Sequence, residues 1–265
     1  MSRYKKILSF IRNNRIEEYK AILTKALSLK YSVISLKDYL TFQPEKAFIL
    51  RHDIDYKSKA TSMMFNIERD LGVTASYYFR KSTFNLPLMK EIENYGSEAS
   101  LHFETVSDFA KAKSVYSKKE LNNFKWKEIC LNNLKADIDN LRNNYGLKCS
   151  TIASHGDPRN NLIETANYFL TWEENAYKKL DIQLEVYNKN FISSLDAYIS
   201  DDSPEINNGY HYNNNPFDEM KKGYSKILFL THPNHWHWNY ISKLKKITKL
   251  VLNGETQKDI DFDLF

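Results

Sequence analysis

Carboxylates and histidines stand at the ends of apolar segments in this chain. The first such end is FILRHDID, where an apolar run leads directly into Asp53 and Asp55. Later segments end in the same way and deliver His102, Glu104, His155, Asp157, Asp201, Asp202, His232 and His235. Carboxylates and neutral imidazoles hold Zn²⁺ or a similar divalent ion in hydrolytic sites and leave a position open for water. A further carboxylate can accept a proton from water, and a further histidine can protonate a leaving group.

The segments that carry these residues alternate with amphipathic stretches. Apolar runs typical of strands occupy residues 47–54, 73–79, 98–103, 149–155, 182–187, 197–201 and 226–232. Helical patterns occupy residues 58–72, 86–96, 118–145, 162–170 and 240–252 and the stretch before Leu29, and Ser35 can cap a turn after a short strand. This strand-then-helix order predicts an α/β fold with a parallel sheet or barrel of about seven strands.

The carboxyl ends of the strands in such a barrel meet at one rim, where active sites are built. We therefore expect Asp53, Asp55, His102, His155 and His232 to lie close together. A lone histidine outside these strand ends is more simply read as a surface residue, and so His211 and His237 are not assigned to the site.

Length and composition favour one domain. The chain has 265 residues, of which 42% are hydrophobic and 14% aromatic, so it has ample material for a core. It contains no linker rich in Pro, Gly or Ser. We predict a single domain over residues 1–265, in which residues 1–46 form a helical and short-strand extension packed on the barrel.

Charge and cysteine usage limit the partners and the compartment. The formal net charge is +5, but the lysines are dispersed among acidic residues and form no basic stripe, which argues against nucleic acid as a partner. Cys130 and Cys149 form no C-x-x-C pair, as expected in a reducing compartment. No run of 18 apolar residues and no signal-peptide pattern occurs, so we expect a cytoplasmic protein without a transmembrane segment.

Six short motifs resemble one known family. LRHDID, GVTASYYFR, GSEASLHFE, SHGDP, YISDD and LTHPNHW occur in the order of the polysaccharide deacetylase superfamily, between about Tyr31 and Trp236. This is the nodulation-factor deacetylase homology domain, or carbohydrate esterase family 4, and the first motif resembles its Arg-His-Asp-Val-Asp branch. The resemblance implies a deformed (β/α) barrel that removes acyl groups, usually N-acetyl, from sugars with the help of a divalent metal, for which Zn²⁺ is the first candidate.

The first motif of the family carries two adjacent aspartates, which are here separated as Asp53 and Asp55. The spacing to the ASYY segment matches Asp55 to the metal-binding aspartate, and this leaves Asp53 as the base. Two residues that are two apart on an extended chain point to the same side. Arg51 and His52 are expected to point away from these two carboxylates, into the barrel wall or among the residues that support the ligands.

The second motif departs from the family pattern. The family has two histidines four residues apart; His102 matches the first, but Val106 stands in the place of the second. Either Glu104 or His155 can complete the set, and we favour His155. The resemblance thus predicts Asp55, His102 and His155 as metal ligands.

The remaining motifs suggest roles for five residues. His232 in LTH matches the proposed general acid, and Asp201 or Asp202 resembles the acidic residue that orients it; we assign Asp202. Trp236 is expected to wall the sugar, and Arg80 and Glu104 are expected to contact substrate. A structural ion pair is an equally simple interpretation of Arg80.

The resemblance implies a carbohydrate substrate that belongs to a cell-surface glycan or to its cytoplasmic precursor. Peripheral association with a glycan assembly system fits this interpretation. Two alternatives stay open. One is a catalytically degenerate barrel that binds a glycan or a biosynthetic partner, which the missing second-motif histidine favours, and the other is a hydrolase of non-sugar C–N bonds.

Overall fold

A curled sheet of nine strands forms the centre of the computed structural model, which describes residues 15–173, 175–202, 209–212 and 215–237. The strands are β1 (Ser32–Ser35), β2 (Ala47–Ile54), β3 (Ser76–Phe79), β4 (Glu98–Phe103), β5 (Thr151–Ser154), β6 (Leu184–Glu185), β7 (Ala197–Asp201), β8 (Tyr210–His211) and β9 (Lys226–Thr231). Their order is β6-β5-β4-β3-β2-β9-β7-β8, and β1 pairs with the first half of β2. Every pairing is parallel except that of β7 with β8.

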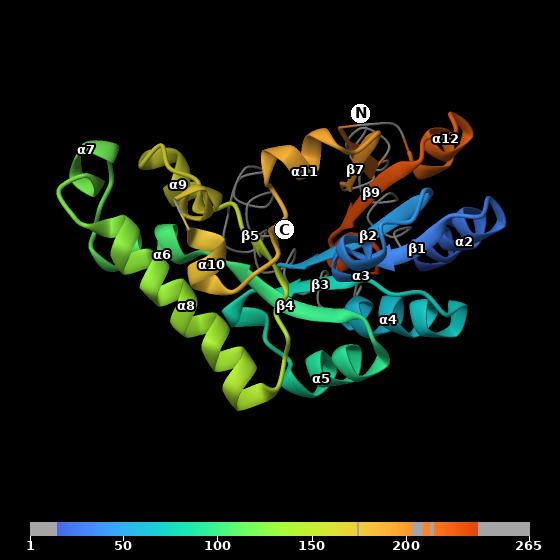
Figure 1. Cartoon of the computed structure of the whole chain (residues 1–265), viewed down its shortest axis with the longest axis horizontal. Coiled ribbons are helices and arrows are strands. Elements are labelled where there is room, and N and C mark those ends of the chain that lie inside the picture. Colours follow the sequence, from blue (N-terminus) through green and yellow to red (C-terminus); the bar gives the residue numbers. More distant parts are fainter. Residues whose placement is uncertain (1–14, 174, 203–208, 213–214, 238–265) are drawn as a thin grey trace, which may run out of the picture.

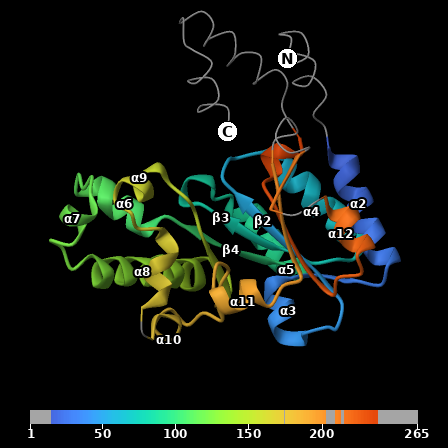
Figure 2. The ribbon, with the colours of Figure 1, turned by 90° about the horizontal axis from the view of Figure 1, so that it is seen from above.

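Helices surround the sheet (Figure 1). They are α2 (Ile16–Ser28), α3 (Leu36–Phe42), α4 (Lys59–Leu71), α5 (Leu86–Tyr95), α6 (Thr105–Ala112), α7 (Lys118–Leu121), α8 (Trp126–Tyr145), α9 (Pro158–Leu162), α10 (Ala176–Leu180), α11 (Lys189–Ser193) and α12 (Pro216–Lys221). Short 3₁₀ helices are η1 (Lys81–Thr83), η2 (Asn167–Trp172) and η4 (Pro233–His235). Figure 2 shows α7, α8 and α10 at one end of the molecule and α2, α4 and α12 at the other.

This architecture confirms the predicted α/β fold with a deformed barrel. In the described part of the chain no strand pairing joins β6 to β7 or β8, so the sheet curls without closing. The predicted strands are present, with β8 as an addition, and Ser35 caps α3 by accepting a hydrogen bond from the backbone N–H of Asp38. None of the described helices is long and apolar enough to cross a lipid bilayer.

Two helix predictions were wrong. The pattern over 118–145 is interrupted between α7 and α8, where Asn122 and Asn123, which have low helix propensity, end the first helix. The pattern over 162–170 is not a helix, because Glu164 adopts a left-handed conformation (φ 47°) and separates α9 from η2. The helix predicted at 240–252 and the start of the N-terminal helix lie outside the described residues.

Alternation along the strands separates two buried layers. Phe48 and Leu50 of β2 point to the layer that is formed with α2, α4, α5, α6 and α8, which we call the helix face. Ala47 and Ile49 point to the opposite layer, closed by α3 and α11, which we call the inner face. Because side chains alternate with a period of two, the polar residues at the end of β2 must divide between the same two faces.

Candidate functional site

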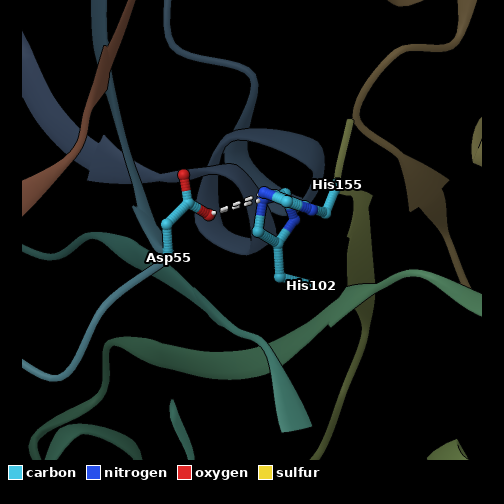
Figure 3. Close-up of side chains that lie close together, drawn as sticks. All are labelled: Asp55, His102 and His155. Atoms are coloured by element: carbon cyan, nitrogen blue, oxygen red, sulfur yellow. Dashed lines mark ion pairs between the residues drawn. The ribbon is translucent and has the colours of Figure 1, made fainter. Parts of the chain in front are cut away.

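Three side chains converge on the inner face at the carboxyl ends of their strands. Asp55 follows β2, His102 lies near the end of β4, and His155 follows β5. Nε2 of His102 lies 3.4 Å and Nε2 of His155 lies 3.5 Å from Oδ1 of Asp55. Figure 3 shows the carboxylate facing both imidazoles, and all three candidate ligand atoms lie within 4.8 Å of one another.

Hydrogen bonds at the far side of each imidazole determine which nitrogen faces this centre. Nδ1 of His102 lies 3.1 Å from the carbonyl oxygen of Ala153, and Nδ1 of His155 lies 3.0 Å from Oε1 of Glu104. A carbonyl or an ionised carboxylate accepts but cannot donate, so each Nδ1 carries a proton, and in the neutral imidazole each Nε2 presents a lone pair. Both lone pairs are directed at Asp55.

A divalent metal fits this donor set. Oδ1 of Asp55 is buried and accepts no hydrogen bond from the protein. Burial alone would raise the pKa of Asp55, but without a metal the protonated forms of His102, His232 and His155 hold that pKa well below its usual range. One carboxylate oxygen and two imidazole lone pairs are the ligands of a three-residue catalytic zinc site.

Asp53 lies beside this centre and is held by Arg51. Nε and Nη2 of Arg51 donate to the two carboxylate oxygens of Asp53 at 2.9 and 2.7 Å, and both side chains are buried. Burial opposes ionisation of Asp53, but the charge of Arg51 outweighs it and lowers the Asp53 pKa. Oδ2 of Asp53 also lies 3.4 Å from Nε2 of His102.

The prediction that Arg51 points away from Asp53 was wrong, but Arg51 does lie among the residues that support the site. Arg51 is two residues before Asp53 and therefore shares its face, whereas His52 points to the helix face as expected. There Nε2 of His52 lies 3.0 Å from Oε1 of the buried Glu68, and its Nδ1 lies 2.5 Å from Oγ1 of Thr231.

Arg80 and Glu104 bind each other rather than lying open to a substrate. Nε and Nη2 of Arg80 donate to the two oxygens of Glu104 at 2.9 and 2.8 Å. Burial opposes ionisation of Glu104, but its bonds with His155 and Arg80 lower its pKa to about 2. This ion pair is the second interpretation that the sequence leaves open for Arg80, and Glu104 orients His155; contact of Arg80 or Glu104 with a substrate stays a prediction.

His232 faces Asp55 from the end of β9 and is held by Asp201. Nδ1 and the backbone N–H of His232 lie 2.7 and 2.8 Å from the two oxygens of Asp201. Burial opposes protonation, but the charge of Asp201 raises the pKa of His232 to about 9. Nε2 of His232 lies 3.9 Å from Oδ2 of Asp55, so the imidazole borders the candidate metal centre.

Asp201, and not the predicted Asp202, therefore lies beside His232. Alternation along β7 places Asp201 on the helix face together with Ile199. There the buried Nε1–H of Trp236 donates a hydrogen bond to Asp201 at 2.5 Å. The side chain of Asp202 is directed to the opposite face, and its carboxylate lies 2.6 Å from Nε2 of His211 on β8.

Trp236 does not wall a sugar-binding surface. Its side chain is fully buried, packed against Tyr19 and Phe229 with the Arg15 guanidinium 4.4 Å from its ring. The sequence LTHPNHW gave no sign of this burial, because an aromatic residue after a strand end is compatible with either environment.

His235 joins Asp201 and His232 in a second group of possible ligand atoms within 4.8 Å of one another. Nδ1 of His235 lies 3.4 Å from Oδ1 of Asp201. Both oxygens of Asp201 already accept hydrogen bonds from His232 and Trp236, so this carboxylate orients imidazoles rather than offering a second metal site.

Val106 is buried in the core at the start of α6. Of the two residues that could complete the set, His155 joins Asp55 and His102, whereas both oxygens of Glu104 bind Arg80 and one of them also binds His155. Asn167, which the sequence did not single out, supports this arrangement. Its Nδ2–H donates to the carbonyl oxygen of His155 at 2.7 Å, and its Oδ1 accepts from the backbone N–H groups of Val106 and Ser107. A single asparagine in a segment predicted as helix carries no sequence signal for this role.

Comparisons with known proteins leave the family open. No protein-family model matches the chain, and no curated protein matches it. Among solved structures it is similar to the Xyl-CE4 domain of a multidomain xylanase from the hindgut metagenome of Trinervitermes trinervoides, with 15% identity, 86% of each chain covered and a TM-score of 0.37. A similarity of this degree assigns neither family nor activity, so the function must be inferred from the side chains.

Proposed function

We propose that this protein is a metal-dependent hydrolase that removes an acyl group, most simply N-acetyl, from a sugar. The observation that carries the proposal is the convergence of Asp55, His102 and His155, with Nε2 of each histidine 3.4–3.5 Å from one carboxylate oxygen that accepts no hydrogen bond from the protein. These residues would hold a divalent ion, with Zn²⁺ as the first candidate. The chemistry that such an ion supplies is polarisation of the acyl carbonyl and activation of water.

The remaining groups suit general acid–base catalysis on either side of this centre. Asp53, which Arg51 keeps ionised, would accept the proton of the attacking water. His232, with a pKa raised to about 9, carries a proton at neutral pH and would donate it to the amine nitrogen as the C–N bond breaks. Asp201 would keep His232 oriented with Nε2 towards the centre.

The substrate that we propose is an N-acetylated sugar of a cell-surface glycan or of its cytoplasmic precursor. The motif order from LRHDID to LTHPNHW supports the sugar, and the two buried, unpaired cysteines suit a reducing compartment. Association with a glycan assembly system follows only if the precursor is the substrate.

Acetate release tests this function. The purified chain is incubated with N-acetylated sugars, O-acetylated sugars and a cyclic amide, with Zn²⁺ or with a chelator. We expect acetate from the N-acetylated sugars, loss of activity with the chelator and no activity in Asp53→Asn. Acetate only from O-acetylated sugars would change the bond type, cleavage of the cyclic amide alone would favour the non-sugar reaction, and binding of sugars without any hydrolysis would favour a degenerate barrel.

A further inference from the structure

Arg15 lies directly before α2 and joins segments that are far away in the sequence. Its backbone N–H donates to the carbonyl oxygen of Trp236 at 2.8 Å, and its guanidinium lies 4.4 Å from the Trp236 ring centroid. Its Nη1 donates to the carbonyl oxygens of Asp202 and Gly209, at 3.4 and 3.5 Å, where β7 ends and β8 is about to begin. We call these contacts the Arg15 clamp.

The segments that the clamp joins carry the group that orients the proposed general acid. Asp201 directly precedes Asp202, and its Oδ2 accepts a hydrogen bond from Nε1–H of Trp236 at 2.5 Å. The same oxygen accepts from the backbone N–H of His232, and Oδ1 of Asp201 lies 2.7 Å from Nδ1 of His232. Two side chains thus separate the guanidinium of Arg15 from the imidazole of His232.

A second carboxylate fixes the plane of the Arg15 guanidinium. Nε and Nη2 of Arg15 donate to the two oxygens of Glu18 at 2.7 and 3.1 Å, and Oε1 of Glu18 also accepts from the hydroxyl of Tyr210 at 2.6 Å. A bidentate pair of this kind restricts the guanidinium to one orientation. Arg15 is only 8% exposed, so the group that lies over Trp236 is both buried and paired.

Gly209 leaves the space that the clamp needs. Its φ is +86°, and a Cβ at this position would lie 2.6 Å from Nη1 of Arg15. Glycine is suited to such a position because it has no Cβ and adopts positive φ without strain. A side chain at residue 209 would therefore displace the guanidinium.

Packing around Trp236 does not by itself call for a charged residue. Tyr19 and Phe229 already cover the indole, with ring centroids 5.5 and 6.0 Å from that of Trp236. Burying a guanidinium is costly unless it is paired. What Arg15 adds to this packing is a set of directed contacts, which tie the indole to the end of β7 and hold its N–H on Asp201.

We infer that Arg15 is a positioning residue for the proposed general acid. It docks the start of α2 on Trp236 and, through Trp236 and Asp201, holds the imidazole of His232 in the orientation that proton donation requires. This inference rests on the proposed function, which it deepens by making the docking of α2 a control on the same site. Loosening this end of α2 should lower turnover while the metal ligands stay in place.

The kinetic test uses the full chain with N-acetylglucosamine and its β-1,4-linked trimer. In Arg15→Ala and Gly209→Ala we expect kcat to fall roughly tenfold with KM and zinc content unchanged, because a misoriented acid impairs the chemical step and not binding. Arg15→Lys should recover part of the loss, since an ammonium can also lie over the ring of Trp236. Arg69→Ala, in a pair that is about half exposed, should turn over like the wild type.

A second readout does not depend on hydrolysis. The indole Nε1–H signal of Trp236 is assigned in ¹H–¹⁵N NMR spectra by its loss in Trp236→Phe, and its exchange with solvent is measured. We expect exchange roughly tenfold faster in Arg15→Ala and Gly209→Ala than in the wild type and Arg69→Ala, because the bond to Asp201 opens more often.

The inference is overturned if either kcat or the indole exchange of folded Arg15→Ala equals that of the wild type, or if kcat falls only together with zinc content. Should Arg15→Ala fail to fold, Gly209→Ala decides by the same two readouts. A wild type that releases no acetate would contradict the proposed function alone. Indole exchange would then still decide whether Arg15 holds Trp236 on Asp201.

Discussion

Nδ1 of His155 lies 3.0 Å from Oε1 of Glu104, and this contact turns Nε2 of His155 towards Asp55. Glu104 is itself fixed by the bidentate bond from Arg80 and stays ionised, with a pKa of about 2. A strand-end glutamate that the sequence offered as a substrate contact thus also orients a candidate ligand. Carboxylates in this position raise the basicity of the imidazole they contact.

Glu104→Gln should therefore weaken metal binding without removing a ligand. We expect the affinity for Zn²⁺ to fall by about 10- to 100-fold, because the side chain that accepts the hydrogen bond from Nδ1 of His155 loses its negative charge. Competition with a chromophoric chelator measures this. Glu164→Gln, at a carboxylate that is 72% exposed, is the matched control and should bind like the wild type; equal affinity in both variants would contradict the orienting role.

Removing Arg51 should destabilise the fold strongly. Arg51→Met leaves the carboxylate of Asp53 buried without its partner, and we expect the free energy of unfolding to fall by about 3–5 kcal/mol. Urea denaturation measures the loss. Arg69→Met is the control, because the Arg69–Glu91 pair is about half exposed and should contribute less than about 1 kcal/mol. Similar losses in the two variants would mean that the Arg51–Asp53 pair is not the buried support described here.

Asp201→Asn should lower kcat much more than Asp202→Asn. Asp201 holds Nδ1 of His232, so its loss leaves the proposed general acid poorly oriented, and we expect kcat to fall by about a hundredfold or more. Asp202 contacts His211 and should affect kcat little. Steady-state kinetics on whichever acetylated sugar is turned over gives the comparison. The reverse order would restore the assignment that the motif YISDD first suggested.

Glu185 should make stability depend on pH near neutrality. Its burial raises its pKa to about 7, despite hydrogen bonds from the backbone N–H groups of Ser154 and Tyr187. Because the folded-state pKa lies above the ordinary value of 4.5, its contribution to stability is complete below pH 4.5 and is lost as pH rises through 7. The stability of wild type relative to Glu185→Gln should thus fall by roughly 3 kcal/mol between these limits. A difference that stays constant with pH in urea denaturation would contradict the raised pKa.

Strand alternation and strand order allowed much of this site to be predicted from the sequence. Asp55, His102 and His155 were expected at one rim because each stands at the end of a parallel strand, and the structure brings them together. Alternation could also have placed Arg51 beside Asp53, two residues away. The prediction was wrong because Arg51 was assigned the direction of its neighbour His52, although residues two apart, such as Arg51 and Asp53, share a face of the strand.

Other contacts depend on packing that no local pattern encodes. Asp201 and Asp202 are adjacent and identical in type. Alternation directs them to opposite faces, but the motif does not show that His232 and Trp236 both meet Asp201. The contact of Asn167 with His155 joins η2 to the end of β5 across a loop.

Metal content of the purified chain tests the central claim most directly. After incubation with Zn²⁺ and desalting, elemental analysis should find one equivalent per chain in the wild type and in His211→Ala, a histidine outside the site. Asp55→Ala, His102→Ala and His155→Ala, each verified as folded by circular dichroism, should retain almost none. Wild-type protein without bound metal, or a folded His155→Ala variant that retains a full equivalent, would contradict the proposed centre.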